Sequence, residues 1–462
     1  MGAGISDWRL ARAVSQLGQL GVVSGTALDN ILARRLQNGD PGGHMRHGLD
    51  HFPFQEMAER IWRAYYIPGG KLPAESYKTL PMHSKDDARE LQELCIVANF
   101  IEVFLAREGH NNPVGINYLE KIQIPHLPSI YGAMLAGVAC VLMGAGVPLK
   151  IPGVLDCFVN HQPATYPLQV SGAQPGDDTT IKFAPRDFAE RELPPLTRPQ
   201  FLAIIASNTL ATTLVKKASG KVDGFIIEGP TAGGHNAPPR GKLQLNEAGE
   251  PLYGERDHVD LEKIRELALP FWLAGGFGTR EKLREALALG AAGIQVGTAF
   301  AFCSESGLRD DYKHALIGKA ISGTAIVFTD PVASPTGFPF KVARLEGSIS
   351  EQEIYSAKPR ICDLGYLREA YRTDEGTIGY RCSGEPVTTY LAKGGKRENT
   401  LGRKCLCNAL VANIGQPQVR AGKYIEKGLV TAGDDLPGIT RFLPLNESAY
   451  SAADVVTALL NA

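Results

Sequence analysis

Two glycine-rich segments that directly follow apolar runs are the parts of this sequence best suited to bind an anion. Gly275–Thr279 follows the run Phe271–Ala274, and Gln295–Thr298 ends the run that begins at Gly293. Glycine allows the backbone to approach a ligand closely and to adopt positive φ, and free N–H groups at the start of a following helix bind anions. The two turns lie about 20 residues apart, which matches the phosphate site after the last two strands of many α/β barrels. The pair therefore predicts a phosphate-binding rim.

A third glycine-rich segment carries the candidate for acid–base chemistry. The apolar run Gly224–Glu228 is followed by the loop Gly229–Arg240, which contains Gly233, Gly234 and His235. Two glycines before a histidine leave the imidazole room to face a planar ligand. The unperturbed pKa of histidine lies near neutrality, which suits general acid–base catalysis. We therefore predict that His235 is catalytic.

The elements that would position these turns are short apolar runs that alternate with helical patterns. This alternation is typical of βα units around a parallel sheet. We expect helices near 26–36, 129–139 and 280–289, and a helix or turn from Ala299. The eight expected strands are Gly21–Ser24, Val114–Tyr118, Val141–Gly144, Tyr166–Val170, Phe201–Ala206, Gly224–Glu228, Phe271–Ala274 and Gly293–Val296. This count favours a closed (β/α)8 TIM barrel, an α/β fold, over an open sheet.

Two regions interrupt the barrel pattern. Residues 39–112 contain helical patterns at 54–66 and 85–107 and are expected to form a mainly helical insertion. Residues 346–462 are expected to form a C-terminal extension, which leaves 1–38 and 113–345 for the barrel. The segment 1–6 reads as the loop after a first strand, yet no strand precedes it. Either that strand is missing from the chain or another segment closes the barrel, and we favour the missing strand.

Composition excludes several classes of partner. The 48 Lys and Arg residues balance 49 Asp and Glu residues, so no basic field would attract nucleic acid or an anionic membrane. The apolar stretch at 131–147 is shorter than a membrane-spanning helix needs, and no secretory signal is visible. Eight cysteines in 462 residues do not indicate a disulfide framework, so a cytoplasmic location is expected.

Four of the cysteines fall in the C-terminal extension: Cys362, Cys382, Cys405 and Cys407. Four thiolates could bind zinc or an iron–sulfur cluster. The spacing lacks paired Cys-x-x-Cys motifs, however, and we favour separate buried thiols and no metal site.

With these motifs in place, the chain resembles the nitronate monooxygenase family, formerly called 2-nitropropane dioxygenases, which also includes FMN-dependent enoyl-acyl-carrier-protein reductases. The resemblance covers roughly residues 1–345 apart from the insertion. It rests on Met1–Ser6, Leu20–Gly25, Val114–Tyr118, Ala232–His235, Ala274–Thr279, Gly290–Phe300 and Ser334–Pro339.

The resemblance implies FMN as cofactor and assigns positions around it. Backbone contacts of Met1, Gly2 and Ala3 would lie against the isoalloxazine ring, and His235 falls on the family's catalytic histidine. The side chain of Glu228, which stands where the family often has glutamine, would meet ribityl hydroxyls or Arg240. The remaining implied flavin contacts are Asn117, Gly233 and, around the phosphate, Gly275, Gly276, Gln295, Gly297 and Thr298.

The activity that the resemblance implies is the oxidation of nitronates or nitroalkanes to a carbonyl compound and nitrite. One alternative is an NAD(P)H-dependent FMN reductase of enoyl thioesters or quinones, with the 39–112 insertion as a lid over a larger substrate. A second alternative is an FMN-binding protein without turnover, which the presence of His235 disfavours. A small-molecule or acyl-thioester substrate is expected. The physiological substrate, a homodimeric state and an acyl-carrier-protein partner stay open at this point.

Overall fold

A computed structural model describes residues 2–460 of the chain. Its central feature is a curled, all-parallel sheet whose seven strands follow chain order, with each strand hydrogen-bonded to the next. The strands are β1 (Gly21–Ser24), β2 (Val114–Leu119), β3 (Cys140–Gly144), β7 (Gln200–Ile205), β8 (Gly224–Glu228), β9 (Phe271–Ala274) and β10 (Gly293–Gln295). The predicted barrel-type α/β fold is confirmed, with seven of the eight expected strands in the sheet.

Strand β3 illustrates why these runs form buried parallel strands. All five of its residues are buried, and successive side chains point to opposite faces of the sheet. Cys140 and Leu142 pack with Leu202 and Ile226 in a small apolar cluster, whereas Val141 and Met143 belong to the main core. Both faces of the sheet are therefore covered, as a continuous apolar run predicts.

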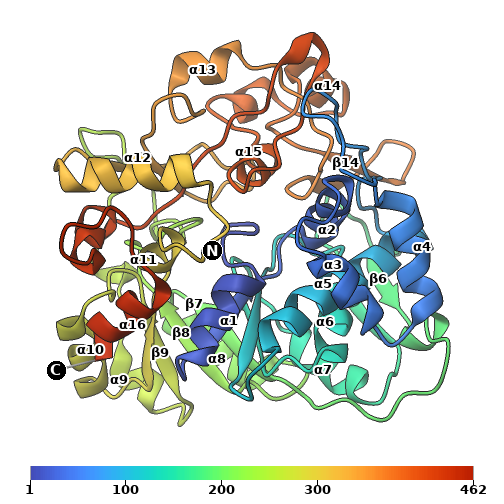
Figure 1. The fold of residues 1–462 in the computed structure, drawn as a ribbon, viewed down its shortest axis with the longest axis horizontal. Helices are drawn as coiled ribbons and strands as arrows, with labels where there is room; N and C mark the ends of the chain where they lie inside the picture. The colour runs from blue at the N-terminus through green and yellow to red at the C-terminus, as the bar shows by residue number, and fades with distance from the viewer. Residues whose placement is uncertain (1, 461–462) are drawn as a thin grey trace.

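Helices surround the sheet (Figure 1). Ser207 caps the helix after β7 by accepting a hydrogen bond from the N–H of Leu210, and Thr279 caps the helix after β9 in the same way through Lys282. These helices are α1 (Trp8–Gln16), α2 (Leu28–Gln37), α6 (His126–Leu135), α7 (Ile151–Val159), α8 (Asn208–Lys217), α9 (Leu261–Arg265), α10 (Arg280–Ala288), α11 (Thr298–Ala301) and α12 (Asp310–Ile321).

The expected strand at Tyr166–Val170 is wrong as a member of the barrel sheet. This segment forms β4 (Ala164–Pro167), which pairs antiparallel with β6 (Thr180–Phe183), and the short β5 (Val170–Ser171). Residues along β4 alternate between buried and exposed. That alternation fits a small antiparallel pair with one solvated face, not a parallel strand covered on both faces.

Segments from 39–112 and from the C-terminal part pack around the sheet. The first contains α3 (His44–Asp50), α4 (Gln55–Tyr65) and α5 (Arg89–Arg107), and α5 contacts α1, α2 and α6. The C-terminal segment, orange to red in Figure 1, covers one end of the sheet with α13, α14 and α15. Its elements, with the strands leading into it, are β11 (Val327–Asp330), β12 (Phe340–Ala343), α13 (Gln352–Ala357), β13 (Glu369–Arg372), β14 (Ile378–Arg381), α14 (Val387–Ala392), α15 (Leu406–Ala412) and α16 (Ala452–Leu460).

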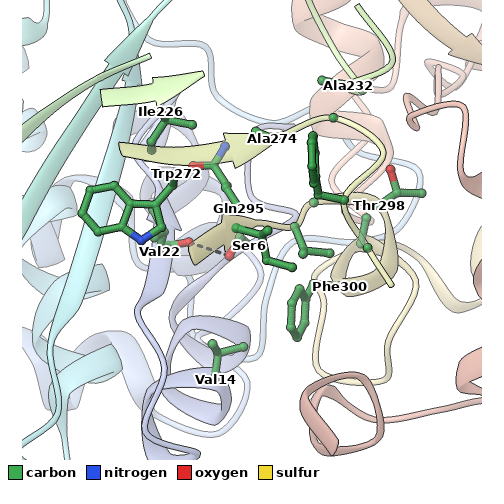
Figure 2. Close-up of a pocket in the computed structure, with 18 of the residues that line it drawn as sticks. Ser6, Val14, Val22, Ile226, Ala232, Trp272, Ala274, Gln295, Thr298 and Phe300 are labelled. Atoms are coloured by element: carbon green, nitrogen blue, oxygen red, sulfur yellow. Dashed lines mark hydrogen bonds between the residues drawn. The ribbon is translucent and has the colours of Figure 1, made fainter. Parts of the chain in front are cut away.

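The two end strands of the sheet, β1 and β10, are not paired with each other, and no other segment of residues 2–460 pairs between them. A cavity of about 520 Å³ opens there. Its apolar wall includes Val14, Val22, Trp272 and Phe300 (Figure 2). The backbone at Ser6 lies against β1, because its carbonyl accepts from the N–H of Ser24 and its hydroxyl donates to the carbonyl of Val22. Within the described residues, the less favoured alternative, that another segment closes the barrel, is therefore wrong.

Candidate active site

Two neighbouring cavities meet at the carboxyl ends of the strands, where active sites of α/β barrels lie. The larger is the cavity of about 520 Å³ between β1 and β10, and the smaller measures about 120 Å³. Gly2, Glu228 and Gly233 border both. Ala3, Asn117 and His235 border the smaller cavity. Gly275, Gly276, Gln295, Gly297 and Thr298 border the larger one. All predicted site residues except Met1, which is outside the described residues, therefore lie around this pair of cavities.

The turn after β9 requires glycine for a backbone reason. Gly275 and Gly276 have φ values of 86° and 73°, in the left-handed region that favours glycine. A Cβ atom on Gly275 would also lie 3.1 Å from the backbone nitrogen of Ala232. The turn thus packs tightly against the loop that carries His235.

Gly297, in the turn after β10, is glycine for a different reason. Its φ of −113° is open to any residue, and a Cβ atom there would meet nothing within 4 Å. The missing side chain leaves open space on the cavity wall, as a turn that receives a ligand needs. The neighbouring Thr298 is engaged already: its Oγ1 accepts a hydrogen bond of 2.8 Å from the N–H of Gly433.

Residues 431–435 join the site from the C-terminal segment, and sequence reasoning missed them. The hydroxyl of Thr431 accepts a 2.7 Å hydrogen bond from the N–H of Gly234, next to His235. Asp435 borders the larger cavity, and burial raises the pKa of its carboxyl group. This segment lies about 130 residues after β10, the last strand of the central sheet, and no sequence pattern links it to the glycine turns.

The His235 side chain is held from the segment that follows the sheet. Its Nε2 lies 2.7 Å from Oγ of the fully buried Ser334, and its ring packs edge-on against Phe340 at 4.9 Å. The main chain is fixed as well, because the N–H of Lys341 donates to the carbonyl of Gly234. Burial lowers the pKa of His235 to about 4, so the imidazole is neutral at pH 7. A neutral, oriented imidazole can accept a proton from a bound molecule.

Asn117 presents an unpaired polar atom to the smaller cavity. It lies on β2, opposite Leu142 of β3, and its Oδ1 is buried without a hydrogen-bond partner among residues 2–460. A buried carbonyl oxygen without a donor costs free energy unless a ligand or water supplies one.

Glu228 is the last residue of β8 and lies at the junction of the two cavities. Burial raises the pKa of its carboxyl group to about 7, so the neutral form is populated at physiological pH. No salt bridge joins it to Arg240 in the described part of the chain. The Arg240 guanidinium instead donates to the carbonyl of Ala206. Of the two predicted partners of Glu228, the arginine is thus the wrong one.

These features fit a flavin mononucleotide. Positive-φ glycines and the open position at Gly297 form a cradle that side chains would fill, and the orphaned Asn117 oxygen can accept from a ring N–H. A half-protonated Glu228 does not repel a nearby ligand as a full charge would. The arrangement has the features of an α/β-barrel protein with a cofactor site at the carboxyl ends of its strands.

Comparison with known proteins supports the resemblance that the motifs indicated. Residues 183–335 match the family model for nitronate monooxygenase. This region of the chain is similar to the nitronate monooxygenase family, and the resemblance indicated by the motifs is confirmed. The matched region contains both glycine turns, His235 and Ser334, but not Asn117.

Curated relatives match over parts of their length. A nitronate monooxygenase of Pseudomonas aeruginosa is 29% identical over 54% of this chain and 64% of its own length, and one of Paraburkholderia phytofirmans is 31% identical over 39% and 47%. A (3aS,4S,5R,7aS)-5-hydroxy-7a-methyl-1-oxo-octahydro-1H-indene-4-carboxyl-CoA dehydrogenase of Rhodococcus jostii is 32% identical over 27% and 31%. The chain thus spans less than two thirds of these relatives.

Solved structures align along almost the whole chain but only loosely. FabK from Thermotoga maritima has a TM-score of 0.47 at 16% identity and covers 99% of this chain and 89% of its own. A nitroalkane oxidase from Streptomyces ansochromogenes has a TM-score of 0.47 at 14% identity over 99% and 92%. These values are too low to support a conclusion about the site. In residues 2–460, no helix combines the length and the apolar character needed to cross a membrane.

Proposed function

We propose that this protein is an FMN-dependent oxidoreductase that converts nitronates, and nitroalkanes after loss of their α-proton, to carbonyl compounds and nitrite with dioxygen. One observation carries the proposal: the glycine turns after β9 and β10 and the loop that carries His235 border two cavities that share Gly2, Glu228 and Gly233. The match of residues 183–335 to the family model for nitronate monooxygenase supports the same reaction class.

We assign the phosphate end of FMN to the larger cavity and the ring end to the smaller one. The phosphate would meet Gly275, Gly276, Gln295, Gly297 and Thr298. The ring would lie near Gly2, Ala3, Asn117 and Gly233, and Glu228 at the junction would meet the ribityl hydroxyls. When bound, FMN supplies the redox chemistry between substrate and dioxygen, which no side chain provides.

The role of His235 follows from its protonation state. With its pKa lowered to about 4 by burial, the side chain is a free base at neutral pH and can remove the α-proton of a nitroalkane. Ser334 holds the ring through Nε2, so His235 would present its other ring nitrogen, or Nε2 itself after a shift of the serine, to the substrate. Phe340 packs edge-on against the His235 ring and keeps water from that side of the base.

The visible spectrum of the purified protein tests the cofactor assignment first. We expect a flavin spectrum with about one FMN per chain, since the cradle forms one site. Anaerobic mixing then tests the activity: a nitronate should bleach the flavin rapidly, whereas NADH and NADPH should not. A colourless protein that does not take up FMN would contradict the proposal, and so would a flavin that no nitronate reduces.

A second candidate function, the NAD(P)H-dependent reduction of an enoyl thioester, is favoured by another cavity. A groove of about 500 Å³ shares Ile122, Tyr366 and Leu367 with the smaller cavity. Lys121 and Arg368 outnumber the one lining carboxylate, Glu369, so a long anionic substrate could extend into this groove. In the same anaerobic experiment, rapid bleaching by NADH or NADPH would support this function over nitronate oxidation.

A further inference from the structure

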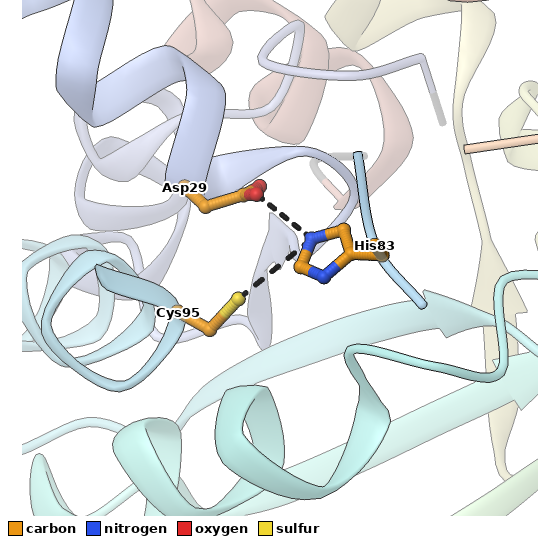
Figure 3. Close-up of side chains that lie close together, drawn as sticks. All are labelled: Asp29, His83 and Cys95. Carbon is orange, nitrogen blue, oxygen red and sulfur yellow. Dashed lines mark hydrogen bonds and ion pairs between the residues drawn. The ribbon is translucent and has the colours of Figure 1, made fainter. Parts of the chain in front are cut away.

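A buried cluster of potential metal ligands lies beside the candidate active site. Asp29 on α2, His83 in the loop before α5 and Cys95 on α5 are 4%, 5% and 1% exposed (Figure 3). Their ligand atoms all lie within 4.8 Å of one another. Within residues 2–460 this is the group of His, Cys, Asp and Glu side chains near enough to share an ion, and the four C-terminal cysteines are not part of it.

The hydrogen bonds of His83 direct one ring nitrogen toward the other two ligands. Its Nδ1 is paired with the carboxylate of Asp87, while Nε2 lies 3.0 Å from Oδ2 of Asp29 and 4.0 Å from Sγ of Cys95. If Nδ1–H donates to Asp87, the lone pair of Nε2 points at Asp29 and Cys95. A carboxylate that holds the second nitrogen of a ligating histidine in this way is the usual outer partner in metal sites.

The centre of the cluster requires positive charge. Nε2 of His83 and Oδ2 of Asp29 lie 3.0 Å apart in a region without bulk water, so either a proton on Nε2 or a metal ion must hold the pair together. A proton on Nε2 would satisfy this pair alone. The sulfur of Cys95 adds a soft third ligand. A proton shared by His83 and Asp29 does not engage this sulfur, whereas a transition metal binds it.

We propose that Asp29, His83 and Cys95 bind a divalent transition metal ion of the Zn²⁺ type. Oxygen, nitrogen and sulfur ligands together suit this ion, which prefers four ligands in tetrahedral array. Three come from the protein. A water molecule would supply the fourth ligand.

The site would act structurally, by joining parts of the chain that are far apart in sequence. Asp29 belongs to the helix after β1, whereas His83 and Cys95 belong to the 39–112 segment. The hydroxyl of Tyr366, from the C-terminal segment, donates to Oδ1 of Asp29 at 2.6 Å, and Tyr366 lines the smaller cavity of the candidate active site. A bound ion would therefore fix the wall of that cavity. The proposal does not depend on which reaction the cavity supports.

Cobalt substitution of the full-length protein tests the site. Protein stripped with a chelator is loaded with Co²⁺, and its spectrum is compared with that of the Zn²⁺-loaded protein so that flavin absorption cancels. We expect about one Co²⁺ per chain and a thiolate-to-cobalt charge-transfer band. The variant Cys95→Ser should lose the band, whereas Cys140→Ser, which changes an equally buried thiol on β3, should keep it.

Two results would overturn the proposal. One is binding of less than about a tenth of an ion per chain after loading and desalting. The other is a band of the same strength in Cys95→Ser. If Cys95→Ser does not fold, X-ray absorption of the Zn²⁺-loaded unsubstituted protein decides instead: a sulfur neighbour at about 2.3 Å supports the site, and a shell of only nitrogen and oxygen contradicts it.

Discussion

Replacement of His235 by asparagine separates proton abstraction from every other part of the proposed reaction. Asparagine is similar in size and keeps a polar group for Ser334, which now lies 2.7 Å from Nε2 of the histidine. The fold around it should persist, because the loop is fixed through its main chain by Lys341 and by the Thr431 hydroxyl. What the variant lacks is the base.

The expected size of the effect differs between two substrates. A positioned general base contributes about 10²–10⁴-fold, so kcat with a neutral nitroalkane should fall by that factor in His235→Asn. A preformed nitronate has already lost its α-proton, and its turnover should fall by less than about tenfold. The measurement is oxygen consumption with both substrates on protein of equal flavin content.

The pH profile identifies the base, because the cavity offers two candidates. Burial lowers the pKa of His235 to about 4 and raises that of Glu228 to about 7. A base is active when deprotonated, so activity that depends on His235 is lost only as pH falls through about 4, whereas activity that depends on Glu228 is lost as pH falls through about 7. At pH 6 a base of pKa 7 is only about one tenth deprotonated, and a base of pKa 4 is almost fully so.

We expect the nitroalkane rate to be flat between about pH 5.5 and 8 and the control Glu228→Gln to retain that flat profile. Equal losses on both substrates in His235→Asn would refute the assignment. A tenfold fall between pH 8 and 6 that disappears in Glu228→Gln would transfer the role to the carboxylate.

Three further changes follow from the structure. Ser334→Ala removes one hydrogen bond to His235, worth about 0.5–1.5 kcal/mol, so kcat/KM with a nitroalkane should fall about 2- to 10-fold while flavin content is unchanged; a loss that matches His235→Asn would contradict a positioning role. Gly297→Ala adds a methyl group in open space, so the free energy of unfolding of the flavin-free protein, measured in urea, should change by less than about 0.5 kcal/mol. FMN titration should nevertheless show weaker binding. Unchanged FMN affinity would contradict the placement of the phosphate at this turn. Glu426→Gln removes the buried carboxylate that pairs with both Lys358 and Arg420, so the free energy of unfolding should fall by about 3–5 kcal/mol. A change below about 1 kcal/mol would show that these ion pairs are not essential.

Much of the fold could be predicted from local pattern. Runs such as Val114–Leu119 and Gly224–Glu228 are apolar at nearly every position and are covered on both faces in the structure, as parallel strands are. The error at Tyr166–Val170 arose because a short run with alternating burial was given the same weight as the continuous ones. The apolar content of a run does not by itself predict which sheet the strand will join.

The candidate site divides in a similar way. The glycine turns and His235 were predictable because each lies in the turn or loop that follows a strand, and carboxyl ends of parallel strands meet at one rim. Ser334 was visible as part of a motif, but its contact with His235 depends on the return of the chain to β12. Asp435 and Tyr366 border the cavities from segments in which no local sequence pattern predicts that contact.

The sequence by itself determined the order of strands and helices and the positions where glycine opens the backbone, because these depend on the periodicity of apolar residues and on local steric limits. Only the tertiary structure decided that β1 and β10 stay unpaired, that residues 431–435 close the rim, and that Asp29, His83 and Cys95 meet. These contacts join residues far apart in the chain. They form because the folded protein buries their surfaces together, and no local pattern records that burial.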